Sequence, residues 1–320
     1  MPVIAGIDEA GYGPRLGPLV VTVVAFEGDD LKPAADLWQR LAEATTRKAG
    51  RSDSRLLVAD SKKAYSTARG PKRLDETVLG CLSAGGWNAG TMNELLAVIC
   101  PDHAAARQGY PWYAGHDVAL PVDAARGDVQ QKAAPLADCL RKTGIRFCGA
   151  ESRVLCAGEF NAGVRRTRNK AVLLFEQVAW LMQSLWDGHA AKGVTVFVDK
   201  QGGRNDYLPC LAPEFMGRSI QVLEEGFNRS AYLIRQDDRR MEVHFVLKGD
   251  DLHFPTALAS MYSKYVRELH MELLNRYWRN EIPSLRPTAG YAADARRFLK
   301  DIEPVRARLG IDPDRLVRVK

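Results

Sequence analysis

The feature that most constrains the fold is a short apolar strand near the N-terminus that ends in two carboxylates and a glycine-rich turn. Residues 3–7 are apolar, Asp8 and Glu9 follow them, and Gly11 and Gly13 lie in the turn. Buried strands seldom carry charge unless the charge has a partner. Two adjacent carboxylates repel each other unless a cation lies between them, and a divalent metal with oxygen ligands is the simplest such cation. The segment therefore predicts a metal site beside a turn whose glycine backbone a bound ligand must approach closely.

Composition narrows the class of protein only slightly. The 320 residues can bury a sizeable core in one large domain or two smaller ones. The net charge of +6 is a mild basic bias, compatible with a polyanionic partner but no proof of one. None of the six cysteines forms a CxxC pair or stands near a histidine at zinc spacing, which favours reduced thiols. With no signal peptide and no apolar run of about 18 residues, we expect a cytoplasmic protein without a membrane span.

Hydrophobic periodicity predicts strands and helices that alternate along the chain. The predicted strands cover residues 2–8, 17–26, 193–199, 219–223 and 243–247. The predicted helices cover residues 33–49, 71–84, 168–187, 256–280 and 294–309. Such a mixture is typical of an α/β fold with helices on the faces of a sheet.

The pattern weakens between about residues 85 and 150, which we interpret as an insertion with helices at 92–99 and 131–142. The insertion is a candidate lid or extra binding surface. Trp112 and Tyr113 could then stack on bases, although aromatics in such a segment more often pack a small core of its own.

Carboxylates also stand at the ends of two later strands. Asp199 ends the strand at 193–199, and Asp250 follows the strand at 243–247. Open sheets bind ligands at strand ends, so these side chains can converge with Asp8 and Glu9. Three or four carboxylates suit a pair of Mg²⁺ or Mn²⁺ ions, an arrangement used for phosphodiester chemistry. Helix capping or turn closure remains an alternative for Asp199 taken alone.

Five segments, spread in order along the chain, closely resemble motifs of the type 2 ribonucleases H. They are the strand and turn at 6–14 with 17–21, the DSKK motif at 60–63, the third-carboxylate strand at 197–199, the KGD segment at 248–250 with 259–264, and the late GY motif at 290–294.

This resemblance implies a ribonuclease H-like α/β fold, with a mixed five-stranded sheet flanked by helices. The implied domains are a catalytic domain over residues 1–255, interrupted by the insertion at about 85–150, and a C-terminal helical substrate-binding extension over 256–320. The implied reaction is endonucleolytic hydrolysis of the RNA strand of RNA–DNA hybrids, possibly including single ribonucleotides in duplex DNA. The implied cofactors are two divalent ions, Mg²⁺ or Mn²⁺. The implied partner is nucleic acid, with no membrane and no evident protein partner.

The resemblance also implies a role for particular residues. The catalytic, metal-binding carboxylates are Asp8, Glu9, Asp199 and Asp250. The substrate-binding residues are Gly11, Tyr12 and Gly13, whose backbone reads the 2′-hydroxyl, Lys62, which faces phosphate, and Tyr291, which stacks under the sugar. Weaker candidates for the same surface are Lys63, Lys264 and Arg297.

The chain departs from the family pattern at two places. Tyr12 stands where the family usually has arginine, so a phosphate contact is lost unless Arg15 replaces it. Glu268 stands where aspartate is usual, and we expect it to support the site or lie on the helix surface. Two other hypotheses therefore stay open: a nuclease of the same fold with an altered substrate preference, and a non-catalytic nucleic-acid-binding relative. The presence of all four carboxylates argues against the second.

Overall fold

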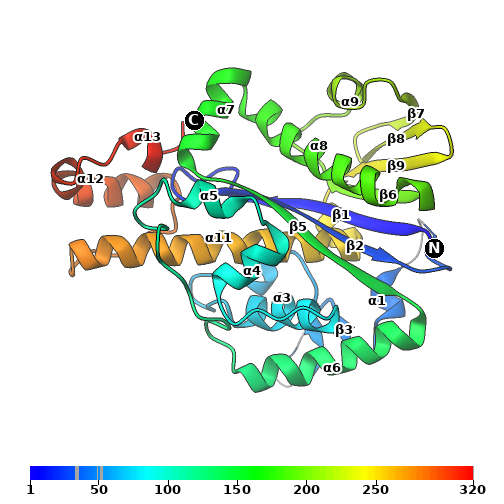
Figure 1. Cartoon of the computed structure of the whole chain (residues 1–320), viewed down its shortest axis with the longest axis horizontal. Coiled ribbons are helices and arrows are strands. Elements are labelled where there is room, and N and C mark those ends of the chain that lie inside the picture. The colour runs from blue at the N-terminus through cyan, green and yellow to red at the C-terminus, as the bar shows by residue number, and fades with distance from the viewer. Residues whose placement is uncertain (33–35, 49, 51–52, 320) are drawn as a thin grey trace.

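A mixed sheet with helices on both faces forms the centre of the computed structural model, which describes residues 1–32, 36–48, 50 and 53–319 (Figure 1). The order of its seven described strands is β5 (Arg146–Leu155), β2 (Leu19–Glu27), β1 (Val3–Ala10), β6 (Val194–Asp199), β9 (Arg239–Val246), β8 (Arg229–Gln236) and β7 (Ser219–Glu225). The central strands β1, β6 and β9 are parallel, and the outer strands pair antiparallel. Parallel central strands bring three carboxyl ends to one edge of the sheet.

The predicted mixed sheet flanked by helices is confirmed, but it has seven strands in the described part of the chain rather than five. Sequence reasoning missed β5 and β8. The first half of β5 is mostly only half-buried and contains Gly149 with a φ of +118°. A register shift interrupts its pairing with β2 near that glycine. Because β5 lies at the sheet edge with partial exposure, its sequence lacks the continuous apolar run of a buried strand.

Two long helices cover the two faces of the sheet (Figure 1). Helix α8 (Lys170–His189) packs on β2, β5 and β6, and α11 (Phe254–Glu281) packs on β1 and β2. Side chains of β1 alternate between the two layers: Ile4 joins the core on the α11 side, whereas Val3 and Ala5 join the core on the α8 side. This period of two is the expected result of a strand buried on both faces.

Most of the longer predicted helices lie within five residues of the observed bounds. They are α3 (Lys72–Ala84), α4 (Met92–Ile99), α6 (Arg126–Thr143), α8, α11 and α12 (Ala292–Arg308). The shorter described helices are α2 (Ser61–Ala64), α5 (His103–Arg107), α7 (Ala157–Thr167), α9 (Leu208–Glu214), α10 (Gly249–Leu252) and α13 (Pro313–Leu316). None of the described helices is long and apolar enough to cross a membrane.

In the part that the structure describes, the predicted helix at 33–49 is confirmed only at residues 37–40 and is wrong beyond them. Helix α1 spans only Leu37–Arg40, and β3 (Thr45–Thr46) then pairs with β4 (Leu56–Leu57). The two adjacent β-branched threonines favour extended backbone, and this preference ends the helical pattern. Residues 33–35 and 49 of the prediction lie outside the described residues.

The aromatic side chains of the predicted insertion are buried in the protein core. Trp112 is 2% exposed and Tyr113 is 3% exposed. They pack edge-on against Tyr277 and His270 of α11, respectively. Their suggested role in stacking on bases is therefore wrong, and they belong to the large core under α11 rather than to a small core of their own. The predicted domain boundary at residues 255 and 256 falls at the start of α11, which shares this core.

Helix α11 begins against the backbone of β1 because residue 6 has no side chain. A Cβ atom at Gly6 would overlap the backbone of Pro255 and Thr256. The hydroxyl of Thr256 also donates to the carbonyl of Phe197 in β6, at 3.2 Å. The start of α11 is thus fixed against two central strands, beside the strand ends that carry the carboxylates.

We expect Gly6→Ala to lower the free energy of unfolding by about 1–3 kcal/mol, since the added methyl group must push α11 from the sheet. Urea unfolding followed by circular dichroism measures this change. Gly188→Ala is the matched control, because a Cβ there meets no atom within 4 Å. Equal unfolding midpoints for Gly6→Ala and the natural chain would contradict the close packing.

Candidate active site

The sheet topology brings three of the four predicted carboxylate positions to one edge. Asp8 lies in β1, Asp199 ends β6, and Asp250 lies in α10 directly after β9. The three strands are parallel neighbours, and their register aligns Ile7 with Val198. Glu9 follows Asp8 on β1. The structure therefore places all four predicted carboxylates at the same end of the central sheet.

Burial and mutual repulsion strongly perturb these carboxyl groups. Burial raises the pKa of Asp8 well above its usual range, and the charges of Glu9 and Asp199 add to the effect. Burial and the charge of Asp199 raise the pKa of Glu9 to about 7. For Asp250, burial together with the neighbouring Asp60 raises the pKa to about 6. Such perturbed groups at a strand edge are characteristic of functional sites, although structural networks also produce them.

Lys62 is the cation that faces this cluster. It lies in α2, whose first turn is capped by the Asp60 side chain accepting from the Lys62 N–H at 3.0 Å. The charges of Asp60, Asp250 and Asp8 raise the pKa of the Lys62 amine. Burial raises the pKa of Asp199, and the attraction of Lys62 opposes that rise. The DSKK segment thus contributes both a further carboxylate and a counter-charge to the site.

Hydroxyl groups behind the cluster hold β1 in place. Ser263 on α11 donates to the backbone carbonyl of Asp8 at 3.0 Å and lies 2.8 Å from the hydroxyl of Thr22. Thr22 in turn lies 2.9 Å from Ser152 on β5. The hydroxyl of Ser260, one turn earlier on α11, lies 3.1 Å from that of Ser61. This buried network is satisfied on both sides, so it fixes the strand that carries Asp8 and Glu9.

The donor atoms of this cluster fit a hard divalent cation, because they are all carboxylate oxygens and they repel one another. In the described residues, however, no group of three or more His, Cys, Asp or Glu side chains is arranged so that it could hold a metal ion. Asp199 instead accepts the Gly249 N–H at 2.7 Å. The carboxylates are close enough to shift each other's pKa but do not form a converged set of ligands.

The glycine turn after β1 is placed beside the carboxylates. Gly11 has a φ of +89°, and a Cβ there would crowd the carbonyl of Pro18 and the side chain of Arg267. The Tyr12 ring packs on the α8-side core with the Lys170 amine 4.7 Å from its centre. Its side chain is therefore engaged in packing, while Gly13 is exposed.

Tyr291 lies on the surface of the late motif. It is 52% exposed, and the guanidinium of Arg267 lies 5.7 Å from the ring centre. Gly290, with a φ of +84°, accepts backbone hydrogen bonds from Arg15 at 2.8 Å and Leu16 at 3.3 Å. The late motif and the glycine turn are thus joined, and an exposed aromatic ring stands next to them.

The weaker sequence candidates are engaged in ion pairs. Lys63 pairs with Asp251, and Lys264 pairs with Glu268 at 2.6 Å. Arg297 donates to Asp294 at 2.7 Å and to two backbone carbonyls before α12. Asp294 also accepts from Thr288 and Ala289, so this pair stabilises the turn at the late motif.

Glu268 supports the site from α11. Its carboxylate accepts from Lys264, from Arg267 at 2.8 Å and from the Tyr65 hydroxyl at 2.7 Å. Arg267 and Lys264 together hold its pKa below the usual range despite burial. Glu268 is thus held in an ion-pair network on α11, and its expected supporting role stays a prediction.

Sequence reasoning missed two arginines that contact the glycine turn and its neighbours. Arg267 is 1% exposed and donates to the carbonyls of Leu16 at 3.4 Å and Ala289 at 3.0 Å. Arg318 is 2% exposed and donates to the carbonyls of Gly11 and Tyr12. An arginine among the apolar positions of α11 was a signal for the first. No local signal marks the second, which lies more than 300 positions from its partners in sequence.

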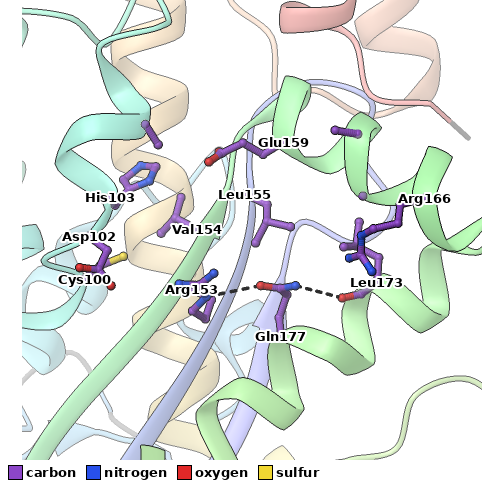
Figure 2. Close-up of a pocket in the computed structure, with 13 residues that line it drawn as sticks. Cys100, Asp102, His103, Arg153, Val154, Leu155, Glu159, Arg166, Leu173 and Gln177 are labelled. Carbon is purple, nitrogen blue, oxygen red and sulfur yellow. Dashed lines mark hydrogen bonds between the residues drawn. The ribbon is translucent and has the colours of Figure 1, made fainter. Parts of the chain in front are cut away.

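A cavity of about 550 Å³ lies between α5, β5, α7 and α8 (Figure 2). Its lining includes Arg153, Arg166, His103 and Glu159. Arg153 donates to Gln177 at 3.4 Å. None of the predicted site residues lines this cavity, so it is separate from the carboxylate cluster.

Solved structures of ribonucleases H are among those that match this chain, all at low sequence identity. One is the ribonuclease HII of Archaeoglobus fulgidus in its complex with PCNA, with 19% identity, coverage of 99% of this chain and 94% of that one, and a TM-score of 0.46. Another is ribonuclease H2 of Pyrococcus horikoshii OT3, with 13% identity, coverage of 98% and 92%, and a TM-score of 0.48.

A third similar structure is Aquifex aeolicus RNase H3, with 14% identity, coverage of 98% of this chain and 71% of that chain, and a TM-score of 0.39. No protein-family model matches the chain, and no curated protein matches it. With TM-scores below 0.5, these likenesses support neither a fold nor a function, and both are argued from the residues of this chain.

The raised pKa of Glu9 predicts a stability that depends on pH. Between about pH 4.5 and 7 the folded protein holds this proton more tightly than the unfolded chain does, so stability falls as the pH rises. Glu9→Gln removes the repulsion and should raise the free energy of unfolding by about 1–2 kcal/mol at pH 8, with no difference below about pH 4. Urea unfolding in the presence of a chelator measures this.

Glu43→Gln is the control, because Glu43 is exposed and pairs only at the surface with Lys142. It should leave the stability nearly unchanged at both pH values. A Glu9→Gln protein that is less stable than the natural chain at pH 8 would show that the carboxylates stabilise one another through a partner.

Proposed function

We propose that this protein is a metal-dependent endonuclease that hydrolyses the RNA strand of RNA–DNA hybrids. The observation that carries the proposal is the gathering of Asp8, Glu9, Asp199 and Asp250 at the ends of three adjacent parallel strands. Their pKa values are raised because these side chains are buried and because neighbouring carboxylates repel one another. Carboxylate oxygens are the ligands that Mg²⁺ and Mn²⁺ prefer, so it is the chemistry of the donor atoms, and not a preformed set of ligands, that supports the metal dependence.

The carboxylates would hold two divalent cations in the active protein. When bound, such ions activate water for attack on a phosphodiester and stabilise the leaving oxygen. The protein's own part is to keep the four side chains at one edge, through the hydroxyl network behind Asp8 and the Gly249 N–H donated to Asp199. Lys62 balances part of the charge and is a candidate contact for substrate phosphate.

The surface next to the carboxylates suits a sugar–phosphate backbone. The glycine turn at residues 11–13 gives close access to backbone donors, and Tyr291 offers an exposed ring for stacking. We propose that cleavage extends to single ribonucleotides in duplex DNA, since the turn and Tyr291 stand side by side. The extension at 256–320 supplies Tyr291, which supports its proposed part in substrate binding.

A second candidate is a nuclease of the same fold with an altered substrate preference. The packing of the Tyr12 side chain on the α8-side core favours it, because the family's usual arginine at this place is absent. Competition between an RNA–DNA hybrid, double-stranded RNA and double-stranded DNA separates the two candidates. Preference for the hybrid supports the first, and preference for either other duplex supports the second.

We expect Asp250→Asn to lower cleavage of a labelled RNA–DNA hybrid by about a hundredfold or more in Mg²⁺ or Mn²⁺, since a metal site contributes several kcal/mol to such a reaction. Asp251→Asn is the matched control, because its side chain is 42% exposed and pairs with Lys63. Cleavage rates on gel-separated products give the result. Full activity of Asp250→Asn, or equal losses in both variants, would argue against the proposed site.

We also expect Tyr291→Ala to lower cleavage beside a single ribonucleotide by about tenfold, because the ring that would stack under the sugar is lost, and one aromatic stacking contact with nucleic acid contributes roughly 1–3 kcal/mol. Tyr291→Phe keeps the ring and should retain most of the activity. The measurement is kcat/KM on a DNA duplex with one ribonucleotide. Similar values for the alanine and phenylalanine variants would remove stacking from the proposed role of Tyr291.

A further inference from the structure

The glycine turn is held from the inside by a guanidinium from the far end of the described chain. Arg318, which follows α13, donates from Nη1 to the carbonyl of Gly11 and from Nη2 to the carbonyl of Tyr12 at 3.0 Å. Its backbone N–H donates to the carbonyl of Arg15 at 2.9 Å. Three hydrogen bonds therefore hold the turn, and Arg15 just after it, to residue 318.

The segment that carries Arg318 is held in place by hydrogen bonds to α7, which do not involve the turn. The Asn161 amide on α7 donates to the carbonyls of Asp314 at 2.9 Å and Val317 at 2.8 Å. Its side-chain oxygen accepts from the Val319 N–H at 2.8 Å. Residues on both sides of Arg318 are thus bound to a helix, as required of a rigid support.

The charge of Arg318 is buried without an acidic partner in the described part of the chain. None of the described carboxylates lies within 4.0 Å of its guanidinium, and its Nε is buried and unpartnered. The Phe160 ring lies 3.9 Å from it. Burial and the nearby Arg267 lower its pKa to about 9. Keeping such a cation is costly, and the carbonyls of the turn are the hydrogen-bond acceptors found for it.

The hydrogen bonds from Arg318 to the carbonyls of Gly11 and Tyr12 fix the orientation of the N–H groups of Tyr12 and Gly13. In a trans peptide the carbonyl of one residue and the N–H of the following residue point to opposite sides. Since the carbonyls of Gly11 and Tyr12 point toward Arg318, the N–H groups of Tyr12 and Gly13 point away from it. Within the described residues, neither N–H takes part in a hydrogen bond. A Cβ on Gly13 would meet no atom within 4 Å, so this side is open.

We infer that Arg318 is a positioning residue that aims the N–H groups of Tyr12 and Gly13 at an oxygen of the bound nucleic acid. This inference rests on the proposed function. Two adjacent N–H groups form a concave donor site for an oxygen atom. A phosphate oxygen and a ribose hydroxyl both offer that chemistry, and the site lies directly after Asp8 and Glu9. Arg318 acts through the turn and does not itself touch the substrate.

Arg318→Lys tests the inference, because it keeps the charge but cannot donate to two carbonyls in a fixed fork. Arg315→Lys is the matched control, since Arg315 lies in the same segment and contacts the carbonyl of Gly109, away from the turn. The substrate is a DNA duplex with four consecutive ribonucleotides. Two modified forms carry either a single 2′-deoxy sugar or a single phosphorothioate next to the cleaved bond. Melting temperatures are measured for each protein.

We expect Arg318→Lys to raise KM by about tenfold or more, with a smaller change in kcat, and Arg315→Lys to behave as the natural chain. One of the two modifications should slow cleavage by the natural protein. The same modification should slow cleavage by Arg318→Lys by a smaller factor. If that modification is the 2′-deoxy sugar, the acceptor is the ribose hydroxyl. If it is the phosphorothioate, the acceptor is a phosphate oxygen. If Arg318 has only a structural role, Arg318→Lys should have a lower melting temperature. Each modification should then slow this variant by the same factor as it slows the natural protein.

The failure of the inference is distinct from that of the proposed function. Normal cleavage by Arg318→Lys, or undiminished penalties for both modifications, would overturn the inference while the nuclease stands. A folded natural protein that cleaves none of the substrates in Mg²⁺ or Mn²⁺ would overturn the proposed function, and the inference would fall with it.

Discussion

Repulsion among carboxylates at the end of the central strands is the constraint on which the rest of the structure depends. Asp8, Glu9, Asp199 and Asp250 are placed together by parallel strands whose pairing is set by buried apolar side chains. The cost of gathering them appears in their raised pKa values. A fold tolerates such a cost where the apolar core is large, as it is here on both faces of the sheet.

The elements around the cluster act to hold it against that repulsion. Helix α11 begins against the backbone at Gly6, contacts β6 through Thr256 and bonds the carbonyl of Asp8 through Ser263. Farther along, it supplies Glu268 and Arg267 beside the late motif. One helix therefore connects the carboxylates, the glycine turn and Tyr291. The aromatic side chains of the insertion, Trp112 and Tyr113, pack on the same helix.

Local sequence patterns predicted the parts of the fold that depend on local rules. The strand at β1, the run at β6 and the amphipathic helices α3 and α8 follow period and burial, so their residues alone indicate them. The gathering of the four carboxylates followed from strand ends in an open sheet. Edge strand β5 and the threonine strand β3 were missed because their structure depends on pairing with distant segments. Arg318 was missed for the same reason, since its partners are chosen only in the folded chain.

The link between residue 318 and the turn at residue 11 has a consequence for the order in which the protein matures. The strand that carries Asp8 and Glu9 is made first, yet the clamp on its turn comes from nearly the last described residue. A nascent chain can pair its early strands but cannot fix this turn until residue 318 has been synthesised. Because contacts so distant in sequence close late, the sheet should form before the site is complete. Competence to act on a substrate would then arrive only after residue 318 has been synthesised and has bound the turn.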